Sequence, residues 1–148
     1  MITKQNLKLL TKAALQAGFV ASPSELKLLT WNAGKETHIP KALEVDFFAV
    51  YIFQHKDKYL KVGKASGPKN NDRYRSHHYI VKASTSNLAK SLTLNKAFAR
   101  LIGKLKPREW IITKTTRYNI LIPKSYGRKF VNFAEAFFIL KCNPMFEA

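Results

Sequence analysis

Hydrophobic residues in the first part of the chain recur at helical spacing, and a capping sequence separates two such runs. The spacing of leucines and alanines predicts a helix over residues 3–17. Ser22, followed by a proline and then by Glu25 three positions on, is typical of a helix start and predicts a second helix up to Gly34. Two short helices joined by a tight turn resemble a helix-turn-helix, but their nearly neutral charge favours a helical hairpin packed on the rest of the protein.

β-Branched and aromatic residues dominate the next segment, where the pattern becomes typical of strands. Strands over 47–53 and 59–62, joined by a polar turn, predict a β-hairpin. Successive side chains of a strand point to opposite faces of the sheet. We therefore expect Tyr51 and Lys61 to lie on one face of the hairpin, away from an apolar set on the other.

The remaining pattern contains both helical and strand-like runs. Residues 73–80 predict a short helix or turn, 86–105 a helix, and 130–142 an apolar last helix. Strand-like runs occur at 111–112 and 118–122. Together these elements predict an α+β fold, in which a small antiparallel sheet (the hairpin and a third strand) is flanked by helices and carries an N-terminal helical appendage.

Charge is distributed unevenly over the 148 residues. The chain carries 26 Lys and Arg against 9 Asp and Glu, a formal charge of +17. Residues 1–46 account for only +2 of this charge and residues 47–148 for +15. The contrast indicates an N-terminal helical hairpin with a connector over 1–46 and a main domain over 47–148. So basic a surface is a poor match for cationic substrates and favours polyanions, with nucleic acid ahead of an anionic membrane.

Other features of the composition exclude several classes of protein. A hydrophobic fraction of 46% is enough for a packed core and excludes a disordered chain. The single cysteine, Cys142, excludes an intrachain disulfide and a cysteine-based zinc cluster. The chain has neither a signal-peptide core nor the roughly 18 apolar residues of a membrane span, so we expect a soluble cytoplasmic protein with no membrane partner.

Glu135 is the one carboxylate in the apolar run over 130–140, which is typical of a helix buried on all sides. A lone carboxylate in such a place is costly unless a cation or hydrogen-bond donors satisfy it. Two interpretations are open: a structural ion pair with an arginine such as Arg73, or a ligand to a metal ion.

Basic residues, aromatic residues and two histidines gather in the segment 72–79. Arginine suits phosphate because its donors form a fixed fork, and histidine can act as a base or donate a hydrogen bond. An ordinary exposed basic turn is the alternative, and in a helix His77 and His78 could not both face one site. The nearby run 63–67 is not a phosphate-binding loop, since Lys58 stands where that motif requires glycine.

Five short motifs in this order resemble those of the GIY-YIG endonuclease superfamily, over about residues 47–148. The motifs are Ala49-Val50-Tyr51, Lys61-Val62-Gly63, Arg73 with His77 four positions later, Glu135 on a late helix, and Glu147 near the end. Lys61 stands at the family's second tyrosine and Glu147 at its terminal asparagine. A lysine at that place resembles one branch of GIY-YIG restriction enzymes.

The resemblance implies a set of roles in phosphodiester hydrolysis. The catalytic residues expected are Tyr51, Lys61, Arg73, His77, His78 and Glu135. Glu135 would hold one Mg²⁺ (or Mn²⁺), since the few acids of this region do not suffice for a two-metal site. Arg73 would stabilise the charged phosphate, and Tyr51 would act as general base or orient the water. Lys61 would favour the Tyr51 phenolate by lowering its pKa, and a histidine would assist by hydrogen bonding.

The function expected is therefore a metal-dependent endonuclease acting on double-stranded DNA, of the type II restriction kind, and a homodimer at least on DNA. DNA contacts are expected from Lys64, Lys69, Arg75, Tyr79 and Arg117, and Glu147 takes the terminal position of the motif. The alternatives are a non-catalytic basic nucleic-acid-binding module and a homing, repair or RNA-directed GIY-YIG nuclease. For Tyr51 itself, the alternative is a packing residue of its strand, with His77 or His78 as the base.

Overall fold

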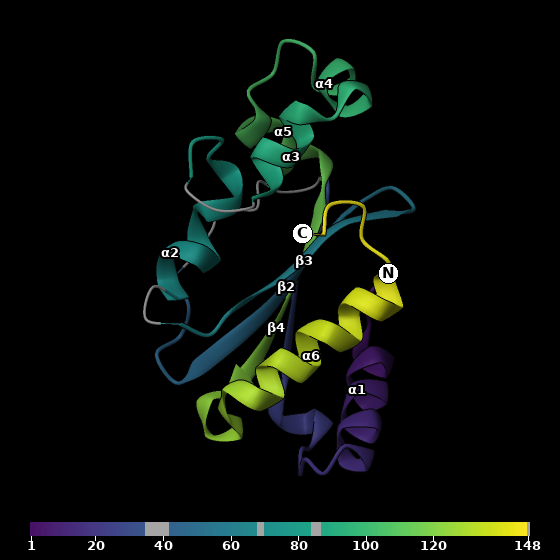
Figure 1. The fold of residues 1–148 in the computed structure, drawn as a ribbon, viewed down its shortest axis with the longest axis vertical. Coiled ribbons are helices and arrows are strands. Elements are labelled where there is room, and N and C mark those ends of the chain that lie inside the picture. Colours follow the sequence, from purple (N-terminus) through teal and green to yellow (C-terminus); the bar gives the residue numbers. More distant parts are fainter. Residues whose placement is uncertain (35–41, 68–69, 84–86, 148) are drawn as a thin grey trace.

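The fold is built on a twisted antiparallel sheet with helices on both faces (Figure 1). The computed structural model describes residues 1–34, 42–67, 70–83 and 87–147. Within these ranges the sheet has four strands in the order β1-β4-β2-β3. The strands are β1 (Lys27–Trp31), β2 (Phe47–His55), β3 (Lys58–Ala65) and β4 (Thr116–Pro123). The predicted α+β class is confirmed, with one strand more than the sequence pattern indicated.

The β2–β3 hairpin confirms the prediction for residues 47–62 and extends it at both ends. Its register pairs Tyr51 with Gly63 and Phe53 with Lys61, so these four residues share one face of the sheet. The expected placement of Tyr51 and Lys61 on one face is therefore correct.

The helix expected from Ser22 to Gly34 is wrong. Pro23–Glu25 forms one short 3₁₀ turn (η1), and the next residues enter the sheet as β1, paired antiparallel to β4. The capping sequence at Ser22 is a local signal, whereas pairing with β4 satisfies backbone groups along the whole of β1. The N-terminal segment thus shares the sheet of the main domain.

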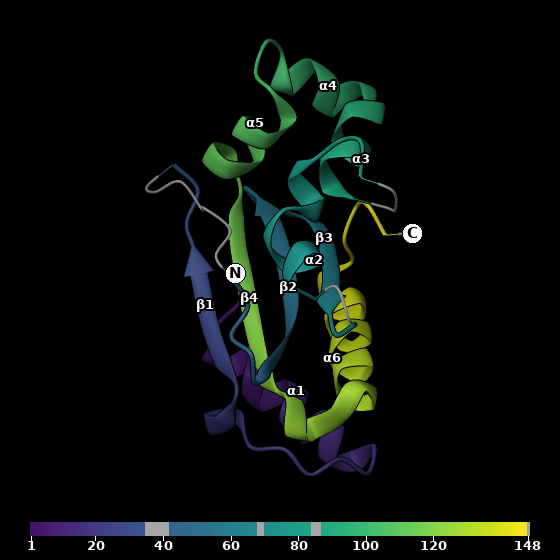
Figure 2. The same ribbon diagram turned by 90° about the vertical axis from the view of Figure 1, so that its left-hand side faces the viewer.

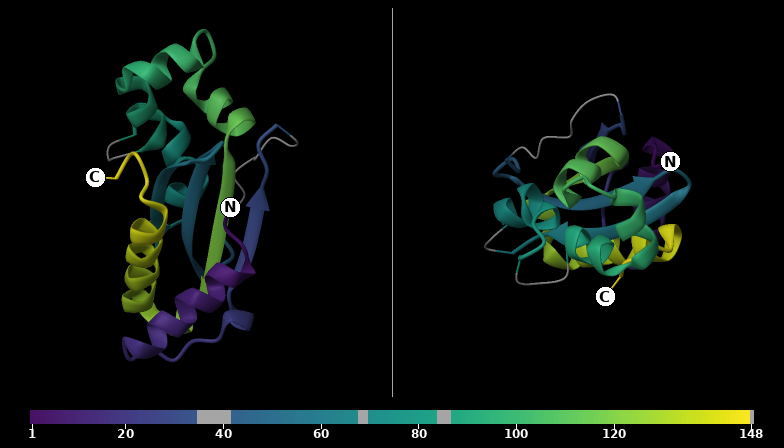
Figure 3. Two further views of the ribbon diagram at one scale, coloured as in Figure 1. Left: turned by 90° about the vertical axis from the view of Figure 1, so that its right-hand side faces the viewer. Right: turned by 90° about the horizontal axis from the view of Figure 1, so that it is seen from above.

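Two helices cover the face of the sheet opposite Tyr51, α1 (Lys4–Gln16) and α6 (Gly127–Cys142) (Figures 1 and 3). Both predicted helices are confirmed. Leu10 of α1 and Phe138 of α6 meet Val50 of β2 in one buried core. However, α6 is not buried on all sides, because its outer face leaves Leu140 85% exposed. In the described ranges, no helix is both long and apolar enough to cross a membrane.

The other face carries a chain of short helices (Figure 2). These are α2 (Asn70–Arg75), η2 (His77–Tyr79), α3 (Leu88–Leu94), α4 (Lys96–Ile102) and α5 (Pro107–Lys114). The single helix expected over 86–105 is interrupted at Asn95, whose side chain accepts hydrogen bonds from the N–H groups of Ala97 and Phe98 and so starts α4. The strand expected at 111–112 is also wrong. These residues belong to α5, which begins at Pro107, and the apolar side chains of this helix fill the core.

Helices α3, α4 and α5 form a lobe that extends beyond the end of the sheet (Figures 1 and 2). Helix α5 of the lobe meets the end of β2 directly, where the His55 ring centroid lies 4.8 Å from that of Trp110 and its Nδ1 atom lies 2.8 Å from the carbonyl oxygen of Lys114. Helices α3 and α5 also pack against η2, so the lobe lies next to the histidines of η2.

Candidate active site

Side chains from five separate elements meet near the β3 edge of the sheet. The pKa of Lys61 on β3 is lowered mainly by burial, and the charges of Glu147, Arg73 and Glu135 act on it as well. The charges of Arg73 and Glu135 also act on Tyr51 of β2. Helix α2 packs against β2 and β3, and α6 packs against β3, so residues that the sequence nominated from far-separated motifs are brought to one edge of the sheet.

Tyr51 occupies the centre of this cluster because Gly63 makes room for it. The Tyr51 side chain is fully buried and its ring lies directly over Gly63 on the neighbouring strand. A Cβ atom at position 63 would lie 2.6–2.7 Å from the ring and hydroxyl of Tyr51. Such contacts are far inside van der Waals distance, so glycine at 63 is a steric requirement for this position of the tyrosine.

His78 holds the hydroxyl of Tyr51 and is itself held by α3. Its Nε2 atom lies 2.6 Å from the Tyr51 oxygen, and its Nδ1 atom accepts a hydrogen bond of 3.2 Å from the backbone N–H of Leu88. Burial lowers the pKa of His78 well below its usual value, so the ring is neutral near pH 7. With Nδ1 as acceptor, the single ring proton sits on Nε2 and is donated to Tyr51.

The ionisation of Tyr51 is set by burial and by two arginines. Burial raises the pKa of Tyr51, while the charge and hydrogen bond of Arg73 and the charge of Arg117 lower it in part. The two arginines are the main charges that lower this pKa, and the expected contribution of Lys61 stays a prediction. The ammonium group of Lys61 donates to the carbonyl oxygen of Phe146 in the C-terminal tail at 2.8 Å.

Arg117 is not a DNA contact, because its side chain is completely buried. Its guanidinium donates to the side chain of Asn119, to the hydroxyl of Tyr79 and to the carbonyl of Tyr74, at 2.6–2.9 Å. Five aromatic rings surround the cation at 4.9–5.7 Å from their centroids: Trp31, Tyr51, Phe53, Tyr74 and Tyr79. Tyr79 is buried with it, so the DNA contact expected from Tyr79 is also corrected. The sequence did contain a signal for this buried network: Arg117 and Asn119 stand two positions apart in an otherwise apolar strand, so both side chains lie on the same face of the sheet.

Glu135 forms an ion pair with Lys64, not with Arg73. The pair lies on the other side of β3 from Tyr51, and the Glu135 side chain keeps 19% of its surface exposed. Its Oε2 atom meets the lysine, and Oε1 has no hydrogen-bond partner in the described part of the chain. The cost expected for a lone carboxylate in a buried helix is therefore relieved by partial exposure and by Lys64, which is less available for DNA as a result.

A metal ion could be held here only in an open coordination mode. The described ranges contain no group of three or more His, Cys, Asp or Glu side chains that could enclose one. Mg²⁺ fits one free carboxylate oxygen, because in nucleotide-processing sites it keeps several waters and takes its remaining ligands from one or two carboxylates and a substrate phosphate. The donor set thus fits the Mg²⁺ expected at Glu135 and would not fit a structural zinc ion.

The C-terminal tail closes the β3 edge beside the cluster. The N–H groups of Met145 and Phe146 donate to the carbonyl oxygens of Tyr59 and Leu60, and the N–H of Val62 donates to Glu147 Oε1 at 3.0 Å. Glu147, at the terminal position of the motif, therefore satisfies a backbone group of β3. Burial raises its pKa and the charge of Lys61 lowers it.

The other predicted residues are placed less centrally. Arg75 is exposed at the end of α2. His77 is half-buried, with its ring centroid 5.4 Å from that of His78. Lys69 lies outside the described residues. Of the two histidines, His78 is the one that contacts Tyr51.

Comparison of the chain with protein-family models, with curated proteins and with solved structures finds no match. The resemblance to GIY-YIG enzymes stays a prediction, supported by the residues of this chain and their arrangement.

Proposed function

We propose that this protein is a metal-dependent endonuclease of the GIY-YIG type that hydrolyses phosphodiester bonds in double-stranded DNA. One observation supports this above all: Tyr51, Arg73 and Glu135, which are far apart in sequence, lie on elements that pack together at the β3 edge, and the charges of Arg73 and Glu135 both act on the pKa of Tyr51.

The arrangement suits the demands of phosphodiester hydrolysis. Arg73 would neutralise the charge that develops on the phosphate, since its forked donors match phosphate oxygens. Tyr51 receives a hydrogen bond from His78 and is acted on by the positive charge of Arg73, and both stabilise its phenolate, the form that can take a proton from the attacking water. Mg²⁺ at Glu135 would supply Lewis-acid stabilisation of the phosphate and leaving oxygen.

The distribution of charge supports DNA as the substrate. The lobe of α3, α4 and α5 carries seven exposed Lys and Arg and a single acid, Glu109. A duplex that reaches the cluster around Tyr51 would also meet this lobe, which stands beside it at the end of the sheet (Figure 2). Phosphate neutralisation by such side chains supplies most of the affinity of non-specific DNA binding.

A homodimer on DNA and sequence-specific cleavage of the restriction kind belong to the same proposal. One cluster can cut one strand, so a double-strand cut requires two copies, and a two-fold axis would match a palindromic site. A non-catalytic DNA-binding module is the second candidate, and the ion pair of Glu135 with Lys64 favours it because that pair occupies one oxygen of the carboxylate expected to hold the metal.

Cleavage of a supercoiled plasmid tests the proposal. The wild-type protein should cut the plasmid with Mg²⁺ and only bind it without Mg²⁺. Glu135→Gln should bind DNA like the wild type and lose at least about a hundredfold in rate, the usual scale for loss of electrostatic stabilisation. Glu109→Gln, at an exposed acid of α5, is the matched control and should cut normally. A folded Glu135→Gln protein that cuts at the wild-type rate would exclude this residue as the metal ligand.

A further inference from the structure

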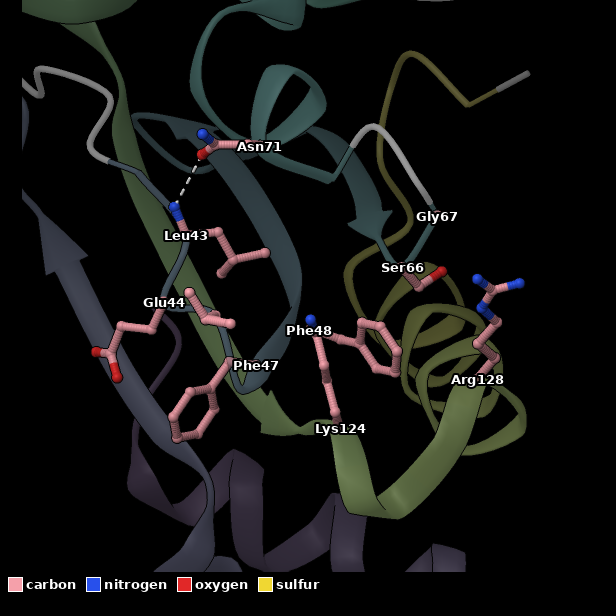
Figure 4. A pocket seen from close by; sticks show the side chains of 10 residues that line it. Leu43, Glu44, Phe47, Phe48, Ser66, Gly67, Asn71, Lys124 and Arg128 are labelled. Atoms are coloured by element: carbon pink, nitrogen blue, oxygen red, sulfur yellow. Dashed lines mark hydrogen bonds between the residues drawn. The ribbon is translucent and has the colours of Figure 1, made fainter.

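A groove of about 570 Å³ opens at the end of the sheet where β2 begins and β3 and β4 end. Figure 4 shows Lys124 extended between the Phe47 and Phe48 side chains, with Ser66 and Arg128 on one side and Leu43 and Glu44 on the other. The Oδ1 atom of Asn71 accepts a hydrogen bond of 3.1 Å from the backbone N–H of Leu43. This bond holds the segment before β2 against α2. The groove is therefore lined by β2, α2, α6 and the 3₁₀ turn η3 (Lys124–Tyr126), together with the segments before β2 and after β3.

The groove continues the candidate active site along each of these elements. On β2, Phe47 precedes Tyr51 by four residues, and Ser66, directly after the end of β3, follows Lys64 by two. On α2, Asn71 precedes Arg73 by two residues. On α6, Arg128 precedes Glu135 by seven residues, two helical turns, so both project from the same side of the helix.

The distance between groove and cluster follows from these offsets. Four strand residues span about 13 Å and two helical turns about 11 Å. Duplex DNA rises about 3.4 Å for each base pair, so the groove lies roughly three to four base pairs from the point where Tyr51 and Arg73 would hold a phosphate.

The charge of the groove is positive. Lys124 and Arg128 are exposed on its wall, and the Lys124 ammonium lies 5.8 Å from the ring centroid of Phe48. Glu44 is the one acid among the lining residues, and Lys27 neutralises it through an ion pair of 2.9 Å. Two cations beside partly apolar walls suit a chain of phosphates and sugars and not a cation or an acidic metal site.

We propose that this groove holds the backbone of the substrate DNA on one side of the scissile phosphate, with Lys124 and Arg128 on phosphates three to four base pairs away. The inference rests on the proposed nuclease function and adds to it the direction in which the DNA lies: along β2 toward the start of α6. It makes Lys124 and Arg128 binding residues that take no part in the bond cleavage itself.

Equilibrium binding to a fluorescent 20-base-pair duplex, measured without Mg²⁺ over a range of salt concentrations, tests the groove. The double variant Lys124→Gln/Arg128→Gln should bind more weakly, and its log–log salt slope should be smaller in magnitude by about 1.8, since each phosphate contact contributes about 0.9. The control Lys129→Gln/Lys141→Gln removes the same charge from exposed positions of α6 that do not line the groove, and should change the slope by much less. Equal changes in the two double variants would overturn the proposal.

Replacing single phosphates of the duplex by uncharged methylphosphonates tests the direction in which the DNA lies on the protein. A single methylphosphonate three to four base pairs from the cut bond should weaken binding of the wild type and have no further effect on the groove variant. The same weakening in both proteins would overturn the proposed position. The salt slopes require binding only, so a protein that binds DNA through the groove but never cuts it would refute the nuclease function alone. A protein that cuts DNA with unaltered slopes would refute the groove alone.

Discussion

The Nε2 atom of His78 lies 2.6 Å from the hydroxyl oxygen of Tyr51, and both side chains are shielded from solvent. Because the N–H of Leu88 occupies Nδ1, this contact has a direction: the histidine donates and the phenol oxygen accepts. A neutral His78 with its proton on Nε2 cannot take a proton from water. Of these two residues, Tyr51 is therefore the one that can act as the base, and its ionisation should govern the rate.

The pH dependence of cleavage should follow Tyr51. Burial raises its pKa above the ordinary value of about 10, so the phenolate is scarce near neutrality and its fraction rises tenfold for each pH unit. At saturating Mg²⁺, the single-turnover cleavage rate should rise with a slope close to one between pH 7 and 9. Tyr51→Phe should lose this rise with pH and most of the cleavage rate.

Tyr118→Phe is the control for the tyrosine, since Tyr118 lies on the other face of the sheet and donates to Gln54. It should leave the rate and the profile unchanged. An unaltered profile in a folded Tyr51→Phe protein would transfer the role of base to another group.

His78 should make the protein sensitive to acid. Burial lowers its pKa well below the 6.5 of an exposed histidine, so as the pH falls the unfolded chain takes up a proton first. The stabilisation is complete above pH 6.5 and is lost below it, by up to about 1.4 kcal/mol for each pH unit. Urea unfolding at pH 7 and pH 5 should show a loss of up to about 2 kcal/mol from this residue.

His78→Gln should lack that loss, because glutamine does not titrate. His55→Gln, on the hairpin, should retain it. Equal acid sensitivity of His78→Gln and the wild type would show that the loss arises elsewhere.

Gly63→Ala should displace Tyr51 without changing the fold. The added methyl group would lie within 2.7 Å of the tyrosine ring, and such overpacking costs about 1–3 kcal/mol. Cleavage should fall by more than the small loss of stability explains, because the hydroxyl leaves His78. Gly67→Ala is the matched control, since nothing lies within 4 Å of its Cβ position. Thermal unfolding and cleavage rates measure both effects, and a fully active Gly63→Ala protein would contradict them.

Lys64 should compete with Mg²⁺ for Glu135. The exposed part of this ion pair limits its strength to about 0.2–1 kcal/mol. Lys64→Met should therefore lower the Mg²⁺ concentration for half-maximal cleavage by about twofold to fivefold. Lys58→Met, on an exposed position of the same strand, should not. A fall in maximal rate with unchanged Mg²⁺ dependence would show that Lys64 contacts the DNA and not only Glu135.

Arg117→Lys should destabilise the protein by about 3 kcal/mol or more, although it conserves the charge. Lysine cannot make the three hydrogen bonds of the guanidinium at once, and each bond to a charged group contributes about 1.5–3 kcal/mol. Arg75→Lys, at an exposed arginine of α2, should be neutral within about 0.5 kcal/mol. Denaturant unfolding measures the free energy of unfolding of both variants. Equal values would contradict the stabilising role of the three Arg117 hydrogen bonds.

The sequence by itself determined the elements whose signals are local. The β2–β3 hairpin follows from alternation and a polar turn, and α1 and α6 follow from apolar residues at helical spacing, since each of these patterns acts within a few residues of chain. The motif order also singled out Tyr51, Arg73 and Glu135, because residue type and spacing are properties of the sequence.

Only the tertiary structure decided the elements and partners that depend on distant segments. Residues 27–31 form a strand because β4 offers them a free edge, which outweighs the helix signal at Ser22. Lys64 and not Arg73 neutralises Glu135, and Arg117 is buried among aromatic rings instead of facing DNA. The physical reason is the same in each case: the energy of a charge or a backbone group depends on which groups lie within a few ångströms, and the packing of the sheet determines these distances.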